Sequence, residues 1–498
     1  MKVQQLIFDD EITLWWMRQS VKAYHIFLDG RLFTVSAVTH VTFPDLLPLH
    51  DYGIRITGED GDVLWEEVVR TREQKPTLTV TDAPYRAKGD GIRNNTAALQ
   101  RALDDCPSGG RVRVPRGIFL TGALRMHSDT ELYLEEGAVL RGSARASDYL
   151  PKLPSRFEGI ERECYQSLLN IGYLDRSAGT TVRNVAVRGR GVLEGGGRAL
   201  FEDTVRAEKG EMRRTDEPLG AYARLMGNVP GWRVRGRLIC ICCAEQVIVS
   251  GIGIRTAPSW NIHMIYSCDV TTYGCRFESR GIENGDGWNP DSSVRCTLFG
   301  CDFRVGDDCI AIKSGKNPEG NRIGLPCRGI RIFDCRSIEG HGIAIGSELS
   351  GGIDDVRIWD CDFSASEYGL HFKTTPKRGG FVRNVTVEHC SFPRLTVESV
   401  RYNDDGESAG EPTVMENIVL RDISLSGVCW YANDEKKPGA ALTVTGDGYL
   451  LRSLSLCNVR ISDNGLMDFR TLTMLSGIRL ENPTFVKDGM KENGKELL

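Results

Sequence analysis

Three aspartates lie in short, glycine-rich segments where they could take part in proton transfer. The first ends Asn284-Gly285-Asp286, and two adjacent acids follow in Gly306-Asp307-Asp308. A lone Asp-Asp pair in such a segment is more often a solvated turn. Carboxyl groups held close together nevertheless acquire different pKa values, because the charge on one opposes ionisation of the next. One can then donate a proton while another accepts one, as hydrolysis of a glycosidic bond requires.

The aspartates belong to a degenerate repeat of alternating apolar and polar residues. Its eight segments read VIVSGIGI, VTTYGCRF, CTLFGCDF, IRIFDCRS, VRIWDCDF, VTVEHCSF, IVLRDISL and LSLCNVRI, and their sixth residues are 23 to 36 positions apart. One short strand motif per period predicts an all-β fold, a parallel β-helix in which each coil buries its face only against its neighbours. The sixth residue should form a buried ladder, made of Ile252, Cys275, Cys301, Cys335, Cys361, Cys390, Ile423 and Val459.

Equal offsets from this ladder place further polar residues beside the aspartates. Asp307, His341 and Glu367 each come six residues after a ladder cysteine, and Lys373 comes twelve after Cys361. Because the coils of a solenoid stack, equal offsets predict one column of polar groups on one face. A column of this kind favours a catalytic site over a solvated turn.

In these motifs the chain resembles glycoside hydrolase family 28, the polygalacturonases and their relatives. The family signatures Asn-Thr-Asp, Gly-Asp-Asp, Gly-His-Gly and Arg-Ile-Lys occur in order and read here Asn284-Gly285-Asp286, Gly306-Asp307-Asp308, Gly340-His341-Gly342 and His371-Phe372-Lys373. The resemblance spans roughly Asp82 to Ile461. It implies a right-handed, single-stranded β-helix and an inverting hydrolase that cleaves α-linked galacturonic acid residues of pectic oligosaccharides. We expect no cofactor and no metal ion.

The resemblance also assigns roles. Asp307 would be the general acid, while Asp286 and Asp308 would hold and deprotonate the attacking water. Inversion needs room for that water, so the acid and the base should stand about 6.5–9.5 Å apart. His341 would hydrogen-bond within the acid network and keep Asp307 protonated, and Lys373 would pair with the substrate carboxylate.

Two positions depart from the family pattern. Gly285 replaces a threonine, which should change little. His371 replaces an arginine that helps to grip the uronate, and a histidine that is mostly neutral at pH 7 cannot form a bidentate fork. Arg378 is the expected substitute; alternatively, the substrate carboxylate is differently placed or absent.

Four more residues complete the expected substrate-binding set. Lys313 is one of several basic residues in predicted loops of the same face that fit an anionic sugar, although exposed lysines as often only aid solubility. Trp260 and Tyr402 could stack on or hydrogen-bond to a sugar ring, or simply be partly buried aromatics. Asn284 enters with the first signature.

The chain should divide into two domains. Residues 1–80 carry short alternating runs such as Tyr24-His25-Ile26-Phe27-Leu28, separated by turns such as Asp29-Gly30, and predict a small β-sandwich that resembles a fibronectin type III module. Residues 81–498 should form the catalytic β-helix. A helix over residues 95–104 should cover its open end.

Composition limits the partners and the compartment. A net charge of −5 argues against nucleic acid as a partner, and no apolar run is long enough to span a membrane. The start has acidic residues where a secretory signal would be basic, so we expect a cytoplasmic protein. The sixteen cysteines predict reduced, buried thiols, and Cys240, Cys242 and Cys243 lack the histidines of a metal site.

Exo action is the expected mode, because insertions near residues 151–235 could close one end of a cleft. A related hydrolase of rhamnogalacturonan or xylogalacturonan is an alternative. Others are a calcium-dependent pectate lyase and a non-catalytic carbohydrate-binding β-helix. The sequence says nothing of the oligomeric state.

Overall fold

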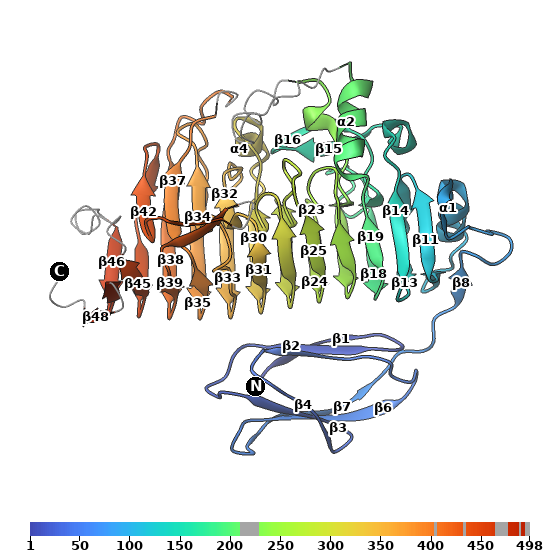
Figure 1. The fold of residues 1–498 in the computed structure, drawn as a ribbon, viewed down its shortest axis with the longest axis horizontal. Helices are drawn as coiled ribbons and strands as arrows, with labels where there is room; N and C mark the ends of the chain where they lie inside the picture. The colour runs from blue at the N-terminus through green and yellow to red at the C-terminus, as the bar shows by residue number, and fades with distance from the viewer. Residues whose placement is uncertain (210–228, 403–405, 432–434, 464–476, 488–489, 494–498) are drawn as a thin grey trace. The chain divides into compact units, whose positions relative to one another are not determined.

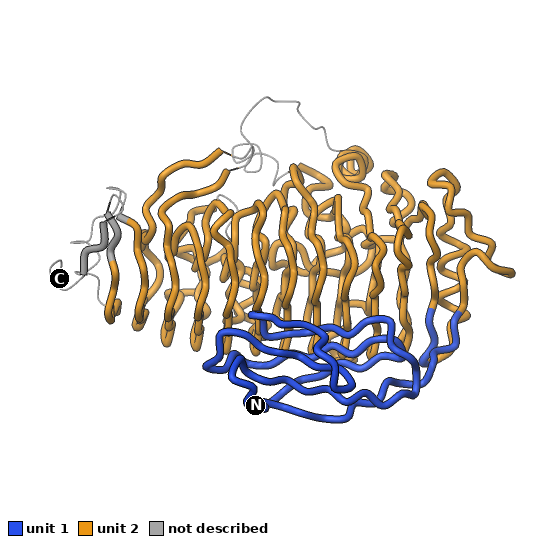
Figure 2. The backbone as a smooth tube through the Cα atoms, turned by 60° about the horizontal axis from the view of Figure 1, so that its bottom comes forward, with its two compact units in different colours: residues 1–77, 109–111 blue, residues 78–108, 112–498 orange. Residues whose placement is uncertain are grey.

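The computed structural model describes residues 1–209, 229–402, 406–431, 435–463, 477–487 and 490–493. Two compact units make up the chain: residues 1–77 with 109–111, and residues 78–108 with 112–498 (Figure 2).

The first unit is a sandwich of two antiparallel sheets. The three-stranded sheet contains β1 (Val3–Ile7), β2 (Ile12–Trp16) and β5 (His40–Phe43). The four-stranded sheet contains β3 (Tyr24–Leu28), β4 (Arg31–Ser36), β6 (Asp51–Thr57) and β7 (Val63–Arg70). Asp29 and Gly30 join β3 to β4 with φ angles of +49° and +74°, as a tight hairpin turn requires. The predicted sandwich is confirmed, and its likeness to fibronectin type III stays a prediction.

The second unit is the predicted right-handed parallel β-helix, with one coil per repeat (Figure 1). Its sheet of fourteen strands contains β8 (Thr77–Thr79), β10 (Arg111–Val114), β13 (Glu131–Leu134), β18 (Val182–Gly189), β21 (Ala244–Ser250), β24 (Cys268–Tyr273), β27 (Val294–Phe299), β30 (Cys327–Phe333), β33 (Ile353–Trp359), β35 (Phe381–Glu388), β38 (Thr413–Arg421), β43 (Tyr449–Leu451), β44 (Leu454–Cys457) and β46 (Ile478–Glu481).

A second face of the coils is formed by two shorter sheets. Eight strands build the first: β9 (Asp90–Asn94), β11 (Gly117–Thr121), β14 (Ala138–Gly142), β19 (Val192–Glu194), β22 (Gly253–Arg255), β25 (Arg276–Ser279), β28 (Asp302–Val305) and β31 (Arg336–Glu339). Isolated β-bridges from Asp362 to Arg336 and to Ser391 connect this sheet to the second short sheet. The second short sheet contains β36 (Ser391–Phe392), β39 (Ser424–Leu425), β45 (Arg460–Asp463), β47 (Thr484–Lys487) and β48 (Met490–Asn493).

The third face is a sheet of ten strands, which we call the cleft sheet because the polar column lies along it. It contains β12 (Leu124–Met126), β17 (Leu169–Gly172), β20 (Ile239–Cys242), β23 (Ile262–Ile265), β26 (Trp288–Asp291), β29 (Ile310–Ile312), β32 (Gly342–Gly346), β34 (Gly369–Thr374), β37 (Leu395–Ser399) and β42 (Leu442–Thr445). Side chains alternate between the inner and the outer face of these strands. In the central strands β20, β23, β26, β29 and β32 the residues of both faces are buried.

The ladder is buried as predicted, because each of its eight members is at most 3% exposed. Each repeat segment is not one strand, however: it bends at its fifth residue and leaves two strands in two sheets. That corner has φ between +50° and +73°, where glycine is favoured and asparagine or aspartate is tolerated. The corner residues are Gly251, Gly274, Gly300, Asp334, Asp360, His389, Asp422 and Asn458.

Short elements decorate the coils. Helix α1 (Thr96–Asp104), predicted from the sequence, buries Leu99, Ala102 and Leu103 in the β-helix core at its N-terminal end (Figure 1). Two antiparallel hairpins, β15–β16 (Leu153–Phe157 and Ile160–Cys164) and β40–β41 (Val428–Tyr431 and Glu435–Pro438), interrupt the coils. The remaining short helices are η1 (Ala146–Tyr149), α2 (Gly197–Ala207), η2 (Trp232–Val234) and α4 (Glu319–Ile323).

Candidate active site

The acidic residues come from the turns that enter neighbouring strands of the cleft sheet. Asp286 precedes β26, the Asp307-Asp308 pair precedes β29, and His341 precedes β32. Backbone hydrogen bonds stack the turns: the Gly287 N–H donates to the Asp308 carbonyl at 2.9 Å, and the His341 N–H donates to the Asp307 carbonyl at 2.9 Å. The sequence segments therefore converge on one row because their coils are in register.

Glycine is needed where these turns touch. A Cβ on Gly287 would lie 2.6 Å from the Phe303 ring, and one on Gly340 would lie 2.6 Å from the Cys309 sulfur. Both distances are shorter than van der Waals contact. The glycines next to the acids thus allow the close approach that brings the carboxylates together.

The predicted polar column is centred on His341. Its Nδ1 lies 3.1 Å from an Asp307 carboxylate oxygen and 3.6 Å from one of Asp308, and its Nε2 lies 3.7 Å from Glu367. The side chains of His341 and Asp307 are 33% and 28% exposed, so a ligand can reach them. Asp286, in contrast, is only 2% exposed.

The surroundings of Asp286 and Asp307 shift the pKa values of these two carboxyl groups in opposite directions. Burial, reinforced by the charges of Asp307 and Asp308, raises the pKa of Asp286 well above its ordinary value, although Lys313 opposes this. Burial also acts to raise the pKa of Asp307, but the hydrogen bond and charge of His341 outweigh it and lower that pKa. Burial would lower the pKa of His341, yet its bonds to Asp307 and Asp308 raise it well above 6.5.

These directions favour a charged His341 beside an ionised Asp307. They run against the expectation that His341 keeps Asp307 protonated. The reason is that a histidine facing two carboxylates gains more from being charged than a carboxyl facing one imidazole gains from being neutral.

Lys313 acts on Asp286 rather than on solvent. Its Nζ lies 3.2 Å from an Asp286 oxygen and 3.5 Å from Glu348, and 4.6 Å above the Trp260 ring. The residue is 6% exposed. The expectation that Lys313 binds the sugar directly is thus wrong, because its ammonium group is already enclosed by these partners.

A second group of buried side chains supports the Asp286–Lys313 pair. Asp291, on β26, accepts from Arg156 at 3.0 Å and contacts His263 at 3.3 Å, and all three side chains are fully buried. Sequence reasoning did not single out Arg156 or His263. Arg156 lies on the β15–β16 hairpin, outside the repeat, so no periodic signal identifies it.

On the other side of His341 the cleft sheet carries His371 and Lys373. His371 Nε2 lies 3.0 Å from Glu398, and burial lowers the pKa of His371, so the imidazole is neutral near pH 7. Tyr402 is the largest influence that raises the pKa of Lys373, and Asp308 and Asp307 add to it, so this lysine is charged. Tyr402 is 36% exposed and lies 3.3 Å from the Ser347 hydroxyl.

Three other predicted substrate-binding residues do not face a ligand. Trp260 is 1% exposed and stacks on Phe157 at 4.7 Å, so it is a core residue. Arg378 is 1% exposed and donates to Asn317 at 2.5 Å, so it cannot replace the missing arginine. The Asn284 side chain accepts from the buried Arg235 at 2.6 Å and holds the turn before Asp286.

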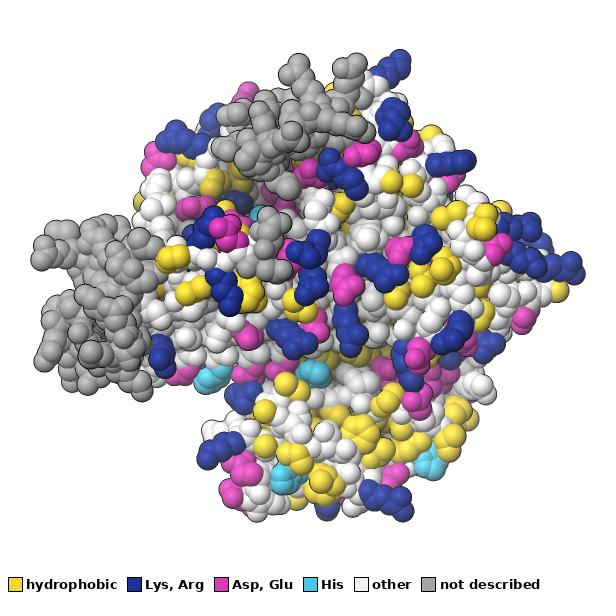
Figure 3. Space-filling view, in the orientation of Figure 1, with side chains coloured by type: hydrophobic (Ala, Val, Ile, Leu, Met, Phe, Trp, Pro, Cys, Tyr) yellow, Lys and Arg dark blue, Asp and Glu magenta, His cyan; other side chains and the backbone are white. Residues whose placement is uncertain are grey.

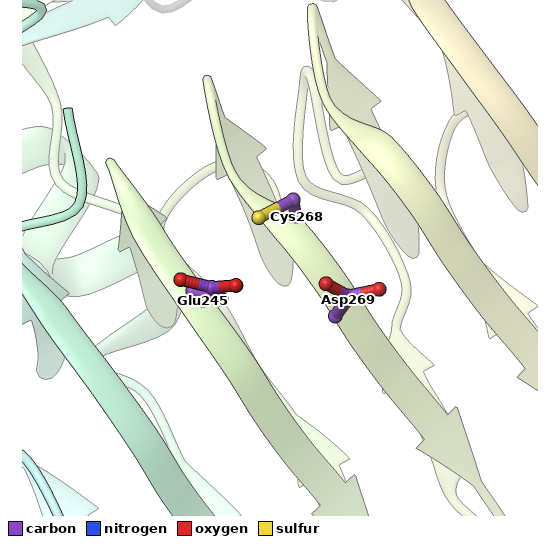
Figure 4. A group of neighbouring side chains, drawn as sticks. All are labelled: Glu245, Cys268 and Asp269. Atoms are coloured by element: carbon purple, nitrogen blue, oxygen red, sulfur yellow. The ribbon is translucent and has the colours of Figure 1, made fainter.

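Two groups of side chains in the described part of the chain are close enough together to hold a metal ion: the catalytic Asp307, Asp308 and His341, and a second group, Glu245, Cys268 and Asp269. The second lies on the neighbouring strands β21 and β24, away from the cleft sheet (Figure 4). Arg295 donates to both oxygens of Asp269 at 2.6 Å, which places a positive charge where a cation would bind. Neither group is needed for the chemistry derived below.

Charges elsewhere are mixed. On the face seen in Figure 3, basic and acidic side chains alternate over the β-helix, in keeping with a net charge of −5. None of the described helices has the length and apolarity needed to cross a membrane. All sixteen cysteines are free thiols, and most are buried.

Comparison with known proteins agrees with this geometry. The profile of "Glycosyl hydrolases family 28" matches residues 156–438. An "Exo-poly-alpha-D-galacturonosidase" of Dickeya chrysanthemi is 26% identical over 437 residues, covering 80% of this chain and 72% of that protein. A "Probable polygalacturonase" of Vitis vinifera is 31% identical over 374 residues, covering 71% and 70%.

Solved structures share the fold. A family 28 exopolygalacturonase of Yersinia enterocolitica superposes with a TM-score of 0.79 at 21% identity, covering 98% of this chain and 96% of that one. A hyperthermoactive exopolygalacturonase of Thermotoga maritima gives a TM-score of 0.65 at 25% identity, covering 84% and 94%.

Proposed function

Because the chain belongs to glycosyl hydrolases family 28, it is a glycoside hydrolase, and we propose that it removes terminal α-linked galacturonic acid residues from pectic oligosaccharides with inversion. The observation that carries the proposal is the stacked group of Asp286, Asp307, Asp308 and His341. It joins one histidine to buried and half-buried carboxylates within one row of coils.

The arrangement accounts for both proton transfers. Asp307, supplied by the proton that it shares with His341, protonates the glycosidic oxygen as the bond from that oxygen to the anomeric carbon breaks. Water adds to the opposite face of that carbon, and its proton passes to the Asp286 and Asp308 carboxylates. Lys313 opposes the rise in the pKa of Asp286 and so favours the ionised form that can accept the proton.

Exo action is supported by the relatives, among them an exo-poly-alpha-D-galacturonosidase and two exopolygalacturonases. The β15–β16 hairpin agrees with this mode, because the insertion packs as a wall against the coils of the site. Its Phe157 stacks on Trp260 before β23, its Arg156 binds Asp291 on β26, and its Gly159 carbonyl accepts from the Lys316 N–H at 3.0 Å, in the coil that carries the Asp307-Asp308 turn. We infer that this hairpin limits the site to the end of an oligosaccharide.

The test is digestion of tri- and tetragalacturonate with products resolved by chromatography. We expect galacturonic acid to be released one residue at a time, and proton NMR of the new reducing end to show inversion. Asp307→Asn should lower kcat by about 10²- to 10⁴-fold. The proposal fails if the wild type releases no sugar, or if the substitution leaves the rate unchanged.

A second candidate substrate is a rhamnogalacturonan fragment. His371 stands where the family has an arginine, and its Glu398 partner adds a negative charge beside it. A neutral sugar on the leaving side would avoid that charge, whereas a uronate would face it. Including galacturonosyl-rhamnose oligomers in the same panel separates the two, since a higher kcat/KM for them than for oligogalacturonides would favour this candidate.

A further inference from the structure

We propose that Arg394 binds a carboxylate of the substrate, on a galacturonate residue that lies along the cleft sheet next to the catalytic turns. The inference rests on the proposed function, and it names a residue that no family signature includes. Arg394 continues the row of catalytic turns, presents its side chain to the cleft and has no acidic partner among the described residues.

Arg394 stands in its coil where the catalytic histidine stands in its own. It directly precedes β37, as His341 directly precedes β32. Backbone hydrogen bonds stack the turn between them: the Tyr368 N–H donates to the His341 carbonyl at 2.8 Å, and the Leu370 N–H donates to the Arg394 carbonyl at 3.1 Å. The strand order β32–β34–β37 puts Arg394 two strands from the His341 turn, or about 10 Å along the row.

The side chain of Arg394 faces the cleft. Leu395 and Val397 of β37 lie in the hydrophobic core, so alternation along the chain sends Arg394 to the outer face of the cleft sheet. The guanidinium lies 4.5 Å from the centre of the Tyr368 ring, and that ring meets His341 edge to face at 5.2 Å. One aromatic ring therefore separates Arg394 from the catalytic histidine.

Arg394 lacks the acidic partner that other cations of the site have. Arg156 pairs with Asp291, and Lys313 pairs with Asp286. Within the described residues, the buried Nε of Arg394 has no hydrogen-bond partner, and no carboxylate pairs with its guanidinium group. Buried polar groups are almost always hydrogen-bonded in folded proteins, so free donors beside a catalytic row indicate a ligand that supplies the acceptors.

The acids near Arg394 are held by other groups. Glu367 lies 3.7 Å from the His341 ring, and Glu398 lies 3.0 Å from His371. The hydrogen bond from His371 lowers the pKa of Glu398, and the charge of Arg394 acts in the same direction without forming a pair. Because His371 is neutral, it cannot balance the charge of a substrate carboxylate. The planar guanidinium of Arg394 can do so, through two parallel hydrogen bonds.

The experiment measures binding of trigalacturonate and of its trimethyl ester to Asp307→Asn, in which hydrolysis is suppressed. Adding Arg394→Gln should raise the Kd of trigalacturonate about 10- to 100-fold, as loss of a charged hydrogen-bonded pair predicts, and should leave the Kd of the uncharged ester within about 2-fold. The matched control Arg357→Gln removes an exposed arginine of β33, in the sheet of fourteen strands, and should leave both Kd values unchanged.

Arg394→Lys in the same background keeps the charge but loses the fork. Its Kd for trigalacturonate should rise only about 3- to 10-fold, so this variant tests the inference even if Arg394→Gln does not fold. Thermal unfolding identifies the folded variants.

Two results would overturn the inference. One is an unchanged Kd for trigalacturonate in the Arg394 variants. The other is equal weakening of both ligands with no recovery in Arg394→Lys, since Arg394 would then only support the Tyr368 ring. Hydrolysis of trigalacturonate by the wild type is measured separately. If no sugar is released, the proposed function fails whatever the Kd values are.

Discussion

At the scale of single residues, Lys313 decides whether Asp286 can accept a proton. Asp286 is buried among carboxylates, and burial raises its pKa. The Lys313 ammonium, 3.2 Å from an Asp286 oxygen, opposes this rise. The same lysine contacts Glu348, so it holds two buried acids at once. A site built this way depends on a residue that never touches the substrate.

Replacing Lys313 by methionine should therefore raise the pKa of Asp286 further. We expect the acidic limb of the kcat/KM profile to move upward by at least one pH unit, about 1.4 kcal/mol of lost interaction, and activity at pH 5 to fall about 10-fold or more. Lys313→Arg, which keeps the charge, should recover most of the wild-type profile. An unchanged acidic limb in Lys313→Met, with intact folding, would show that this ion pair does not control Asp286.

His341 should control the basic limb of the kcat/KM profile against pH. Its pKa is raised well above 6.5 by Asp307 and Asp308, so the shared proton stays bound through neutral pH and is lost only as the pH rises through that raised value. We expect the basic limb of kcat/KM above pH 6.5 in the wild type. In His341→Gln the limb should fall to lower pH and kcat should drop about 100-fold, because Asp307 then holds its proton alone. A wild-type limb below 6.5 would contradict this reading.

Asp307 and His341 could be predicted as neighbours because they lie at equal offsets within the repeat, whereas Asp286, eleven residues after Cys275, could be predicted only from its motif. Glu348, Arg156 and His263 could not be found that way. They reach the site from other offsets and, for Arg156, from an inserted hairpin, so only the folded chain brings them near. The prediction that Trp260 could stack on a sugar ring does not hold for a related reason. An indole ring suits such stacking, but the Phe157 ring already covers this one.

At the scale of the elements, the corner of each coil controls how well the strands stack. The sequence revealed the buried ladder but not the corner before it, since Gly, Asp, His and Asn share no pattern except tolerance of positive φ. His389 is the least suited of them. Its φ is +53°, its side chain is exposed, and the neighbouring coil places Asp422 at the same corner.

Substitutions at His389 should follow backbone preference rather than packing. His389→Val should lower the free energy of unfolding by about 1–2 kcal/mol, because a β-branched residue is strained at positive φ. His389→Gly should match or exceed the wild type, since glycine adopts this φ without strain. Urea unfolding followed by circular dichroism measures both. Equal stability of the two variants would mean that the corner is not strained.

At the scale of the whole molecule, the β-helix carries the catalytic row along one sheet, and the β15–β16 hairpin packs as a wall against the same coils. The wall depends on the buried group of Arg156, Asp291 and His263, which joins the hairpin to β26. Because this group contains His263, it also makes the free energy of unfolding depend on pH.

His263 should make the protein sensitive to acid between pH 6.5 and about 3. Burial lowers its pKa to about 3 in the folded chain, against 6.5 when unfolded. The unfolded state alone therefore binds a proton as the pH falls below 6.5, and stability contributed by the neutral imidazole is progressively lost. The shift corresponds to about 5 kcal/mol when complete. Protonation of Asp291 does not add to this loss above pH 3.8. The pKa of Asp291 is lowered in the folded chain, so its contribution to stability is lost only below that pH.

Urea unfolding at pH 7 and pH 4.5 checks this, with His263→Gln as the comparison. The wild type should lose more free energy of unfolding between the two pH values than the variant, whose glutamine cannot titrate. His40, whose pKa burial lowers to about 4, contributes to the slope in both proteins and cancels from the difference. If both proteins lose the same free energy, His263 is already protonated in the folded state, and the wall of the cleft is held by Arg156 and Asp291 alone.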